Sequence, residues 1–254
     1  MIASLVFPFF LMVQLQSAKT DEVPVATVNV GKIKAEYLRS KGLTITYGDV
    51  PVSIDNQIVV TSPTEGLIFD SKGKEPVCAI TKLGTEGKIL NISFHAPHPN
   101  IPDITEKVEI RPDNSIVMKL DIDWTSKASG IANWLVADLD SKILNDAAWH
   151  AECTDYSYPK GTYFSEHKAS NKPETVETVI VKNFWTLDIL ATRVRMRVAP
   201  SQDSADLIWT TSTGMNPITA VIQPTTALWY RHMELTKDSS NHKTVRIDLS
   251  KGSK

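Results

Sequence analysis

The chain has 254 residues, a formal net charge of −2 and a hydrophobic content of 42%, and its sequence pI is near 6.3. This content is enough to build a core, so the composition excludes an intrinsically disordered chain. The near-neutral charge excludes the basic surface that nucleic-acid backbones require. Neutral or mildly charged partners therefore suit this chain better than polyanions.

The first eighteen residues are predicted to form a signal peptide. An apolar run extends from Leu5 to Val13, and the small residues that follow end at Ala18, where we expect cleavage. The run lacks a preceding Lys or Arg, and it is shorter than the roughly 20 residues of a membrane-spanning helix. A buried N-terminal strand or helix is the alternative. Export would place the mature protein outside the cell or in the periplasm, with no membrane contact after cleavage.

Behind residues 1–18, the sequence divides into three parts. Residues 19–41 are a lead with a first strand at 23–30 and a short helix at 32–41. Residues 42–250 are predicted to be one domain made of strands, with a second short helix near 140–148 and a long loop near 155–174. Residues 251–254 are polar, as a tail or the start of a linker would be.

Apolar residues recur with a period of two in most of the domain, which is the pattern of half-buried strands. The clearest cases are residues 115–124, 192–198 and 243–249, where apolar and charged side chains alternate. Such strands place one face on a core and the other in water, as antiparallel sheets do. About fifteen short strands separated by Gly, Pro, Asn and Asp turns predict an all-β fold, a large two-sheet antiparallel β-sandwich of the supersandwich kind.

The two cysteines, Cys78 and Cys153, allow two interpretations. In an exported protein they can form a disulfide that closes a long loop and stabilises the fold. Both also lie in apolar surroundings, so two separate buried thiols fit the sequence as well. Two cysteines cannot form a structural zinc site alone, and His95 and His98 lack a third ligand. We expect no metal and no cofactor.

Carboxylates at alternate strand positions are candidates for catalysis. Asp121, Asp123 and Asp138 are of the residue type that glycoside hydrolysis uses in pairs, one as an acid and one as a base or nucleophile. The alternative is a solvated face, or one that pairs with the arginines of residues 193–197. Motifs of nucleotide-binding enzymes, α/β-hydrolases and zinc proteases do not occur in the sequence.

Aromatic side chains are the candidates for sugar binding, because the C–H faces of a sugar ring stack on aromatic planes. Trp229 and Tyr230 are adjacent in the sequence and point to opposite faces of a strand, so one of them is expected to be exposed unless both faces are covered. Trp149 precedes the irregular stretch near residues 155–174. Packing in the core is the alternative for each of the three.

Residues 42–144 resemble the N-terminal β-sandwich regions of large secreted bacterial glycoside hydrolases. The residues that carry the resemblance are Gly42-Leu43-Thr44-Ile45, Val108-Glu109-Ile110, Asp113-Asn114-Ser115 and Ala132-Asn133-Trp134-Leu135. The resemblance implies a non-catalytic module that packs on a following catalytic domain or holds polysaccharide for it. It transfers no catalytic residue to this chain.

Two other functions stay open. The chain can be a self-contained enzyme, a glycoside hydrolase that uses its strand carboxylates, or an extracellular structural or adhesion domain. A binding module needs aromatic side chains along a groove, whereas a hydrolase needs two carboxylates in one cleft. An adhesion domain needs only an apolar patch or an open edge strand.

Overall fold

The computed structural model describes residues 22–140, 143, 147–154, 162–168, 179–182, 184–202, 206–216, 221–237 and 241–252. The predicted signal peptide, most of the second predicted helix, and residues 155–161 and 169–174 of the predicted long loop lie outside these residues. The middle of that predicted loop is a strand instead, at Thr162–Lys168. Within them, no helix is long and apolar enough to cross a membrane.

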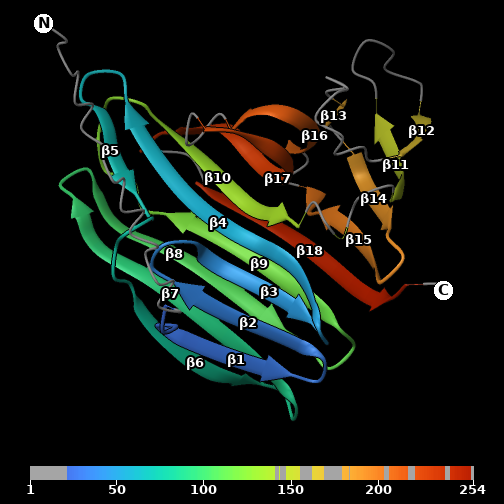
Figure 1. The fold of residues 1–254 in the computed structure, drawn as a ribbon. Coiled ribbons are helices and arrows are strands. Elements are labelled where there is room, and N and C mark those ends of the chain that lie inside the picture. Colours follow the sequence, from blue (N-terminus) through green and yellow to red (C-terminus); the bar gives the residue numbers. More distant parts are fainter. Residues whose placement is uncertain are drawn as a thin grey trace, which may run out of the picture.

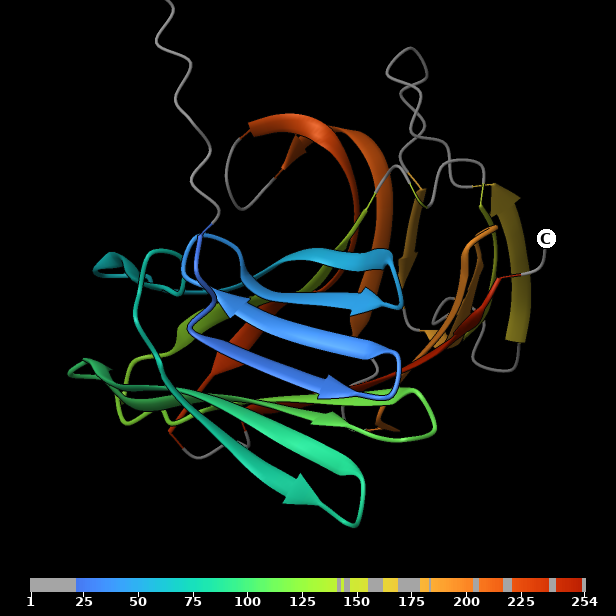
Figure 2. The ribbon, with the colours of Figure 1, turned by 60° about the horizontal axis from the view of Figure 1, so that its bottom comes forward.

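The described strands form two antiparallel sheets of nine strands each, which pack face to face (Figure 1). We call them sheet A and sheet B, and the outer face of each is the one turned away from the other sheet. Figure 2 shows the two layers, with β1 to β3 in blue above the green strands β6 to β9. The predicted two-sheet antiparallel sandwich is confirmed.

Sheet A contains, in spatial order, β1 (Ala26–Val30), β2 (Ile33–Leu38), β3 (Gly42–Tyr47), β4 (Val50–Ser62), β10 (Gly130–Leu139), β17 (Val221–Leu235), β16 (Leu207–Asn216) and β13 (Val179–Lys182), while β5 (Gly66–Asp70) pairs with β4. Sheet B contains β12 (Thr162–Lys168), β11 (Ala148–Thr154), β14 (Phe184–Leu190), β15 (Val194–Pro200), β18 (His242–Lys251), β9 (Ser115–Ile122), β8 (Ile101–Ile110), β7 (Gly87–His98) and β6 (Val77–Leu83).

The three clearest alternating segments of the sequence became three neighbouring strands of sheet B. They are β15, β18 and β9, which lie side by side in this order. Their apolar residues, such as Met196, Ile247 and Leu120, are buried, while the charged residues between them face outward. One face of each strand therefore covers the core, as the alternation predicts.

The helix predicted at residues 32–41 is wrong, because this segment forms strand β2. Its side chains alternate in burial, with Ile33, Ala35 and Tyr37 in the core. The next strand begins at Gly42, whose φ is +70° and whose Cα lies so close to β4 that an added Cβ would be 2.2 Å from the Asn56 carbonyl oxygen. Only glycine suits this position.

Cys78 and Cys153 are free thiols, so the disulfide interpretation is wrong. Cys78 lies on β6, at one edge of sheet B, and Cys153 lies on β11, next to the opposite edge. Six strands of sheet B lie between β6 and β11. The two thiols are therefore too far apart to bond, since a disulfide needs Cα atoms within about 7 Å. Burial raises the pKa of Cys78 to about 11, which keeps it protonated.

A carboxyl group joins the two sheets inside the core. Glu106 on β8 of sheet B accepts hydrogen bonds from the Asn56 Nδ2 (2.9 Å) and the Trp134 Nε1 (3.0 Å), both on sheet A. Burial raises the pKa of Glu106 to about 7, although both hydrogen bonds act to lower it. Trp134 also stacks on Tyr230, with ring centroids 5.6 Å apart. This buried network fixes how the sheets face each other.

Candidate functional site

A row of polar residues crosses four neighbouring strands on the outer face of sheet B. His150 on β11 is paired with Asp188 on β14, Asp188 with Arg197 on β15, and Arg197 with Asp248 on β18. Side chains directly opposite each other in a sheet are neighbours, so the register brings these four together. Their sequence neighbours, such as Ile189 and Met196, are buried in the core. We call these four residues the polar row.

The polar row lines a cleft of about 520 Å³. Leu190, Arg195 and Ser250 line it as well, from the same strands. A volume of this size is in the range of sites for small molecules, about 300–1,000 Å³. The Leu190 side chain is 44% exposed, so the cleft offers apolar surface beside its charged groups.

Arg197 and Asp188 form the best-defined ion pair of the cleft. The Arg197 Nε and one terminal nitrogen donate to the two Asp188 oxygens at 2.7 and 2.8 Å. This bidentate contact holds the pKa of Arg197 above its ordinary value. Two parallel hydrogen bonds fix the orientation of the guanidinium relative to the carboxylate. Both groups are therefore positioned before any ligand arrives.

Trp185 is an exposed aromatic side chain on the same sheet. Glu152 pairs with Thr186 and Cys153 with Phe184, so Trp185 is the extra residue of a β-bulge in β14. Bulges re-aim side chains, and Trp185 is 50% exposed while Phe184 is buried. The other five tryptophans are at most 5% exposed. Trp185 lies three residues from Asp188, about 10 Å along the strand.

The aromatic residues predicted to bind sugar do not form a site. Trp149 and Tyr230 are 2% and 0% exposed and lie in the core between the sheets, so the prediction for these two is wrong. Trp229 lies on the outer face of sheet A, in a small apolar cluster with Leu135 and Ala227. It is 5% exposed, and the Arg231 guanidinium lies 4.2 Å from its ring centroid.

The predicted catalytic carboxylates lie on opposite sides of the molecule. Asp121 and Asp123 flank the buried Ile122 and therefore face outward from sheet B, and Asp121 forms an ion pair with Lys119 at 3.2 Å. Asp138 is on β10 of sheet A, opposite Asp55 of β4. A cleft that joins Asp121 or Asp123 with Asp138 is thus impossible, because the sandwich lies between them.

Asp138 nevertheless has an unusual environment. Burial raises its pKa to about 7, and the neighbouring carboxylate of Asp55 adds to this effect while Lys72 opposes it. Lys72 itself is bound to Asp55, with the Nζ 2.6 Å from a carboxylate oxygen. This acid pair is therefore partly neutralised by one lysine.

The described residues hold no group of three or more His, Cys, Asp and Glu side chains that could bind a metal ion. His95 is paired with Asp103 at 2.6 Å and His98 with Glu65 at 3.2 Å. The two histidines thus have separate carboxylate partners on the surface.

The sequence contained signals for part of the cleft. The alternation of residues 192–198 shows that Arg197 faces outward, and the adjacent aromatics Phe184 and Trp185 cannot both face the core of a regular strand. The sequence does not reveal the spatial order of the strands, which places β11, β14, β15 and β18 side by side.

No known protein-family profile matches the sequence, and no curated protein sequence matches it. Solved structures match its fold. An alpha-N-acetylgalactosaminidase (NagBb) of Bifidobacterium bifidum aligns with 90% of this chain and 36% of its own, with a TM-score of 0.58 and 9% identity. The chain thus spans about a third of that enzyme.

Two further structures share the fold. The galactose 1-epimerase of Lactobacillus acidophilus aligns over 89% of this chain and 94% of its own, with a TM-score of 0.58 and 9% identity. The GH36 alpha-galactosidase AgaA of Geobacillus stearothermophilus, in a form crystallised with stachyose, aligns over 90% of this chain and 41% of its own, with a TM-score of 0.56 and 8% identity. At these identities the likeness concerns the fold, which is the β-sandwich found in these carbohydrate-active enzymes.

Proposed function

We propose that this chain is a non-catalytic carbohydrate-binding module whose saccharide lies on the outer face of sheet B. The observation that carries the proposal is the presence of an exposed tryptophan, Trp185, on the strand that also carries Asp188 of the pre-positioned Asp188–Arg197 pair. The fold shared with sugar-acting enzymes agrees with this assignment.

The chemistry of the cleft, together with that of Trp185 farther along β14, suits a sugar ring. One face of a pyranose is rich in C–H groups and packs on an aromatic plane such as that of Trp185. Its hydroxyls both donate and accept hydrogen bonds. Asp188 and Asp248 can accept from them, and Arg197 can donate to them. The distance of about 10 Å between Trp185 and Asp188 along the strand suits two consecutive sugar units better than one.

The module would work beside a catalytic domain. The two glycoside hydrolases compared above are longer than this chain, which spans 36% and 41% of them. In our proposal the sandwich packs on such a domain, or holds polysaccharide for it, outside the cell or in the periplasm. The predicted signal peptide at residues 1–18 supports this location.

Binding of saccharides to the purified chain tests the proposal. A glycan array would identify the ligand, and calorimetry would measure the affinities of the wild type, W185A and R197A. We expect both substitutions to weaken binding about tenfold or more, because stacking and charge-assisted hydrogen bonds each contribute at least about 1.4 kcal/mol. R111A is the matched control, since Arg111 forms a comparable surface ion pair with Glu109 outside the cleft. Failure of every saccharide to bind would refute the proposal.

A second function, that of a self-contained glycosidase, is favoured by one observation. Asp188 and Asp248 line the same cleft from strands that are separated only by β15. Two strand spacings place their backbones about 10 Å apart, close to the carboxylate separation of inverting glycosidases, about 6.5–9.5 Å. Product analysis of the saccharides that bind would decide: release of sugar that D248N abolishes would replace the binding module with an enzyme.

A further inference from the structure

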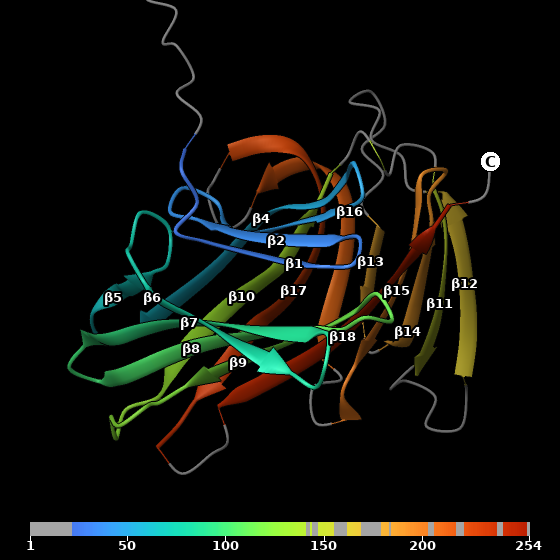
Figure 3. The same cartoon turned by 90° about the horizontal axis from the view of Figure 1, so that it is seen from below.

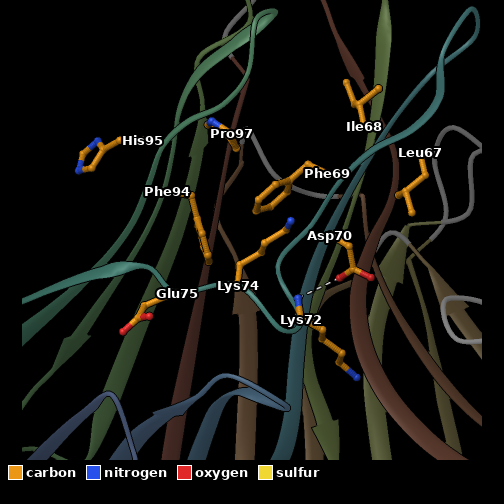
Figure 4. Close-up of a pocket in the computed structure, with 10 residues that line it drawn as sticks. All are labelled: Leu67, Ile68, Phe69, Asp70, Lys72, Lys74, Glu75, Phe94, His95 and Pro97. Atoms are coloured by element: carbon orange, nitrogen blue, oxygen red, sulfur yellow. Dashed lines mark hydrogen bonds between the residues drawn. The ribbon is translucent and has the colours of Figure 1, made fainter.

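A second cleft of about 520 Å³ opens at the other end of the molecule (Figure 4). It lies between β5, the turn at residues 71–75 and the end of β7, far from β11 and β14 in both Figure 1 and Figure 3. Phe69 and Phe94 form its floor, with ring centroids 5.1 Å apart in an edge-to-face contact. Leu67, which is 63% exposed, extends the apolar surface at the rim.

One wall of this cleft is a turn that hydrogen bonds hold in place. The Ser71 amide donates to the Ile58 carbonyl and the Ile58 amide donates to the Ser71 Oγ, both at 2.9 Å. The Gly73 amide donates to the Arg39 carbonyl at 2.7 Å, and Gly73 has a φ of +74° that suits glycine. The turn is therefore a rigid support for the side chains it carries.

The opposite wall is a strained bulge of β7. The pairing with β8 is regular up to His95 and resumes only at His98. Between them Ala96 has a φ of +45°, in the left-handed region that residues with a Cβ seldom adopt. Such strain costs about 1–3 kcal/mol and is concentrated at ligand sites. The bulge sets His95 and Pro97 against the cleft.

The charged groups that line the cleft are paired, with one exception. Lys72 is bound to Asp55, Glu75 to Arg39 and His95 to Asp103. Asp70 accepts from the Gln57 Nε2 at 2.8 Å. Lys74 has no ion-pair or hydrogen-bond partner for its ammonium group among the residues that the structure describes. In Figure 4 its side chain extends into the space beside Phe69.

We propose that this second cleft binds an acidic sugar, a hexuronate unit, independently of the cleft on sheet B. The carboxylate would pair with the free ammonium of Lys74. The C–H face of the ring would lie against the exposed Leu67 and the small part of Phe69 and Phe94 that the cleft reaches. The Asp70 carboxylate can accept from a ring hydroxyl. A neutral hexose lacks the group that pairs with Lys74, so the cleft selects for the acid.

Ligand-observed NMR and calorimetry on the full chain test this assignment with galacturonate, galactose and cyclohexanecarboxylate as probes. We expect galacturonate to bind at least about tenfold more tightly than either of the others, and its affinity to fall as salt screens the ion pair. The K74A variant should lose about tenfold in affinity for galacturonate, and K74R should retain most of it. K82A, which removes an exposed lysine of β6, is the matched control.

Three outcomes would overturn the proposal. They are absence of galacturonate binding, binding that K74A leaves unchanged, and equal affinity for cyclohexanecarboxylate, which would mean a carboxylate site without sugar recognition. The two clefts are also separable: W185A and R197A should not change galacturonate binding here, and K74A should not change binding on sheet B. Failure of one site therefore leaves the other testable.

Discussion

Glu106 and Asp188 are both carboxylates on interior strands of sheet B, but they face opposite sides of it. Glu106 points into the core, where its Oε1 accepts from Asn56 and Trp134 and its Oε2 has no hydrogen-bond partner within the described part of the chain. Asp188 points to the outer face, where Arg197 donates to both of its oxygens. The first is enclosed by protein, and the second borders an open cleft.

This difference separates structural acids from binding acids. Perturbed pKa values are often a sign of a functional site, yet the raised pKa of Glu106 is caused by burial in the core, out of reach of any ligand. Buried charged groups are costly and are kept where they specify how elements pack. We infer that Glu106 sets the register of the two sheets, whereas Asp188 is available for recognition.

The largest effect is expected from removing the Glu106 carboxyl. The E106A variant would leave the Trp134 Nε1 and one Asn56 hydrogen without an acceptor and would create a cavity, so we expect a loss of about 3–5 kcal/mol in the free energy of unfolding. Urea denaturation of E106A and the wild type measures it. E109A is the control, because Glu109 is on the same strand with surface partners, and its loss should be below about 1 kcal/mol. Equal losses would contradict the structural role.

The pH dependence of E106Q isolates the charge of this group. The pKa of Glu106 is raised from 4.5 to about 7 by folding, so between these values the folded state binds more protons than the unfolded state. The wild type therefore loses stability as pH rises through this window, by up to about 3 kcal/mol. E106Q lacks this loss.

The two proteins should be similarly stable at pH 4, and E106Q should be the more stable at pH 9. Urea titrations at several pH values measure the difference. A constant difference between the two proteins from pH 4 to pH 9 would show that the Glu106 pKa is not raised by folding.

How much the sequence revealed can be judged on these same residues. Periodicity identified the strands and the outward arginines, because alternation is a local property. It assigned residues 32–41 to a helix, although Ile33, Ala35 and Tyr37 share one strand face. It could not place Glu106 opposite Asn56 and Trp134, because those contacts join residues 50 and 28 positions apart. The cleft likewise depends on strand order, which no local pattern contains.

Asp138 should show an intermediate effect. Burial and the Asp55 carboxylate raise its pKa from 3.8 to about 7, so its charge destabilises the fold as pH rises through this window. It is less enclosed than Glu106, and we expect D138N to gain about 1 kcal/mol at pH 8 relative to the wild type and nothing at pH 3. Thermal unfolding at both pH values measures this. A loss at pH 8 would mean that Asp138 is held charged by a partner.

The smallest effect on stability is expected in the cleft on sheet B. The Arg197 side chain is 60% exposed, and exposed ion pairs contribute about 0–1 kcal/mol. R197A should therefore change the free energy of unfolding by less than about 1 kcal/mol, even though we expect it to reduce saccharide affinity about tenfold. Urea denaturation and calorimetry on the same sample compare the two. If R197A unfolded as readily as E106A, the polar row would be part of the scaffold, and the contrast between Glu106 and Asp188 would be lost. If R197A lowers only the affinity for saccharide, Glu106 has a structural role and the Asp188–Arg197 pair has a role in binding.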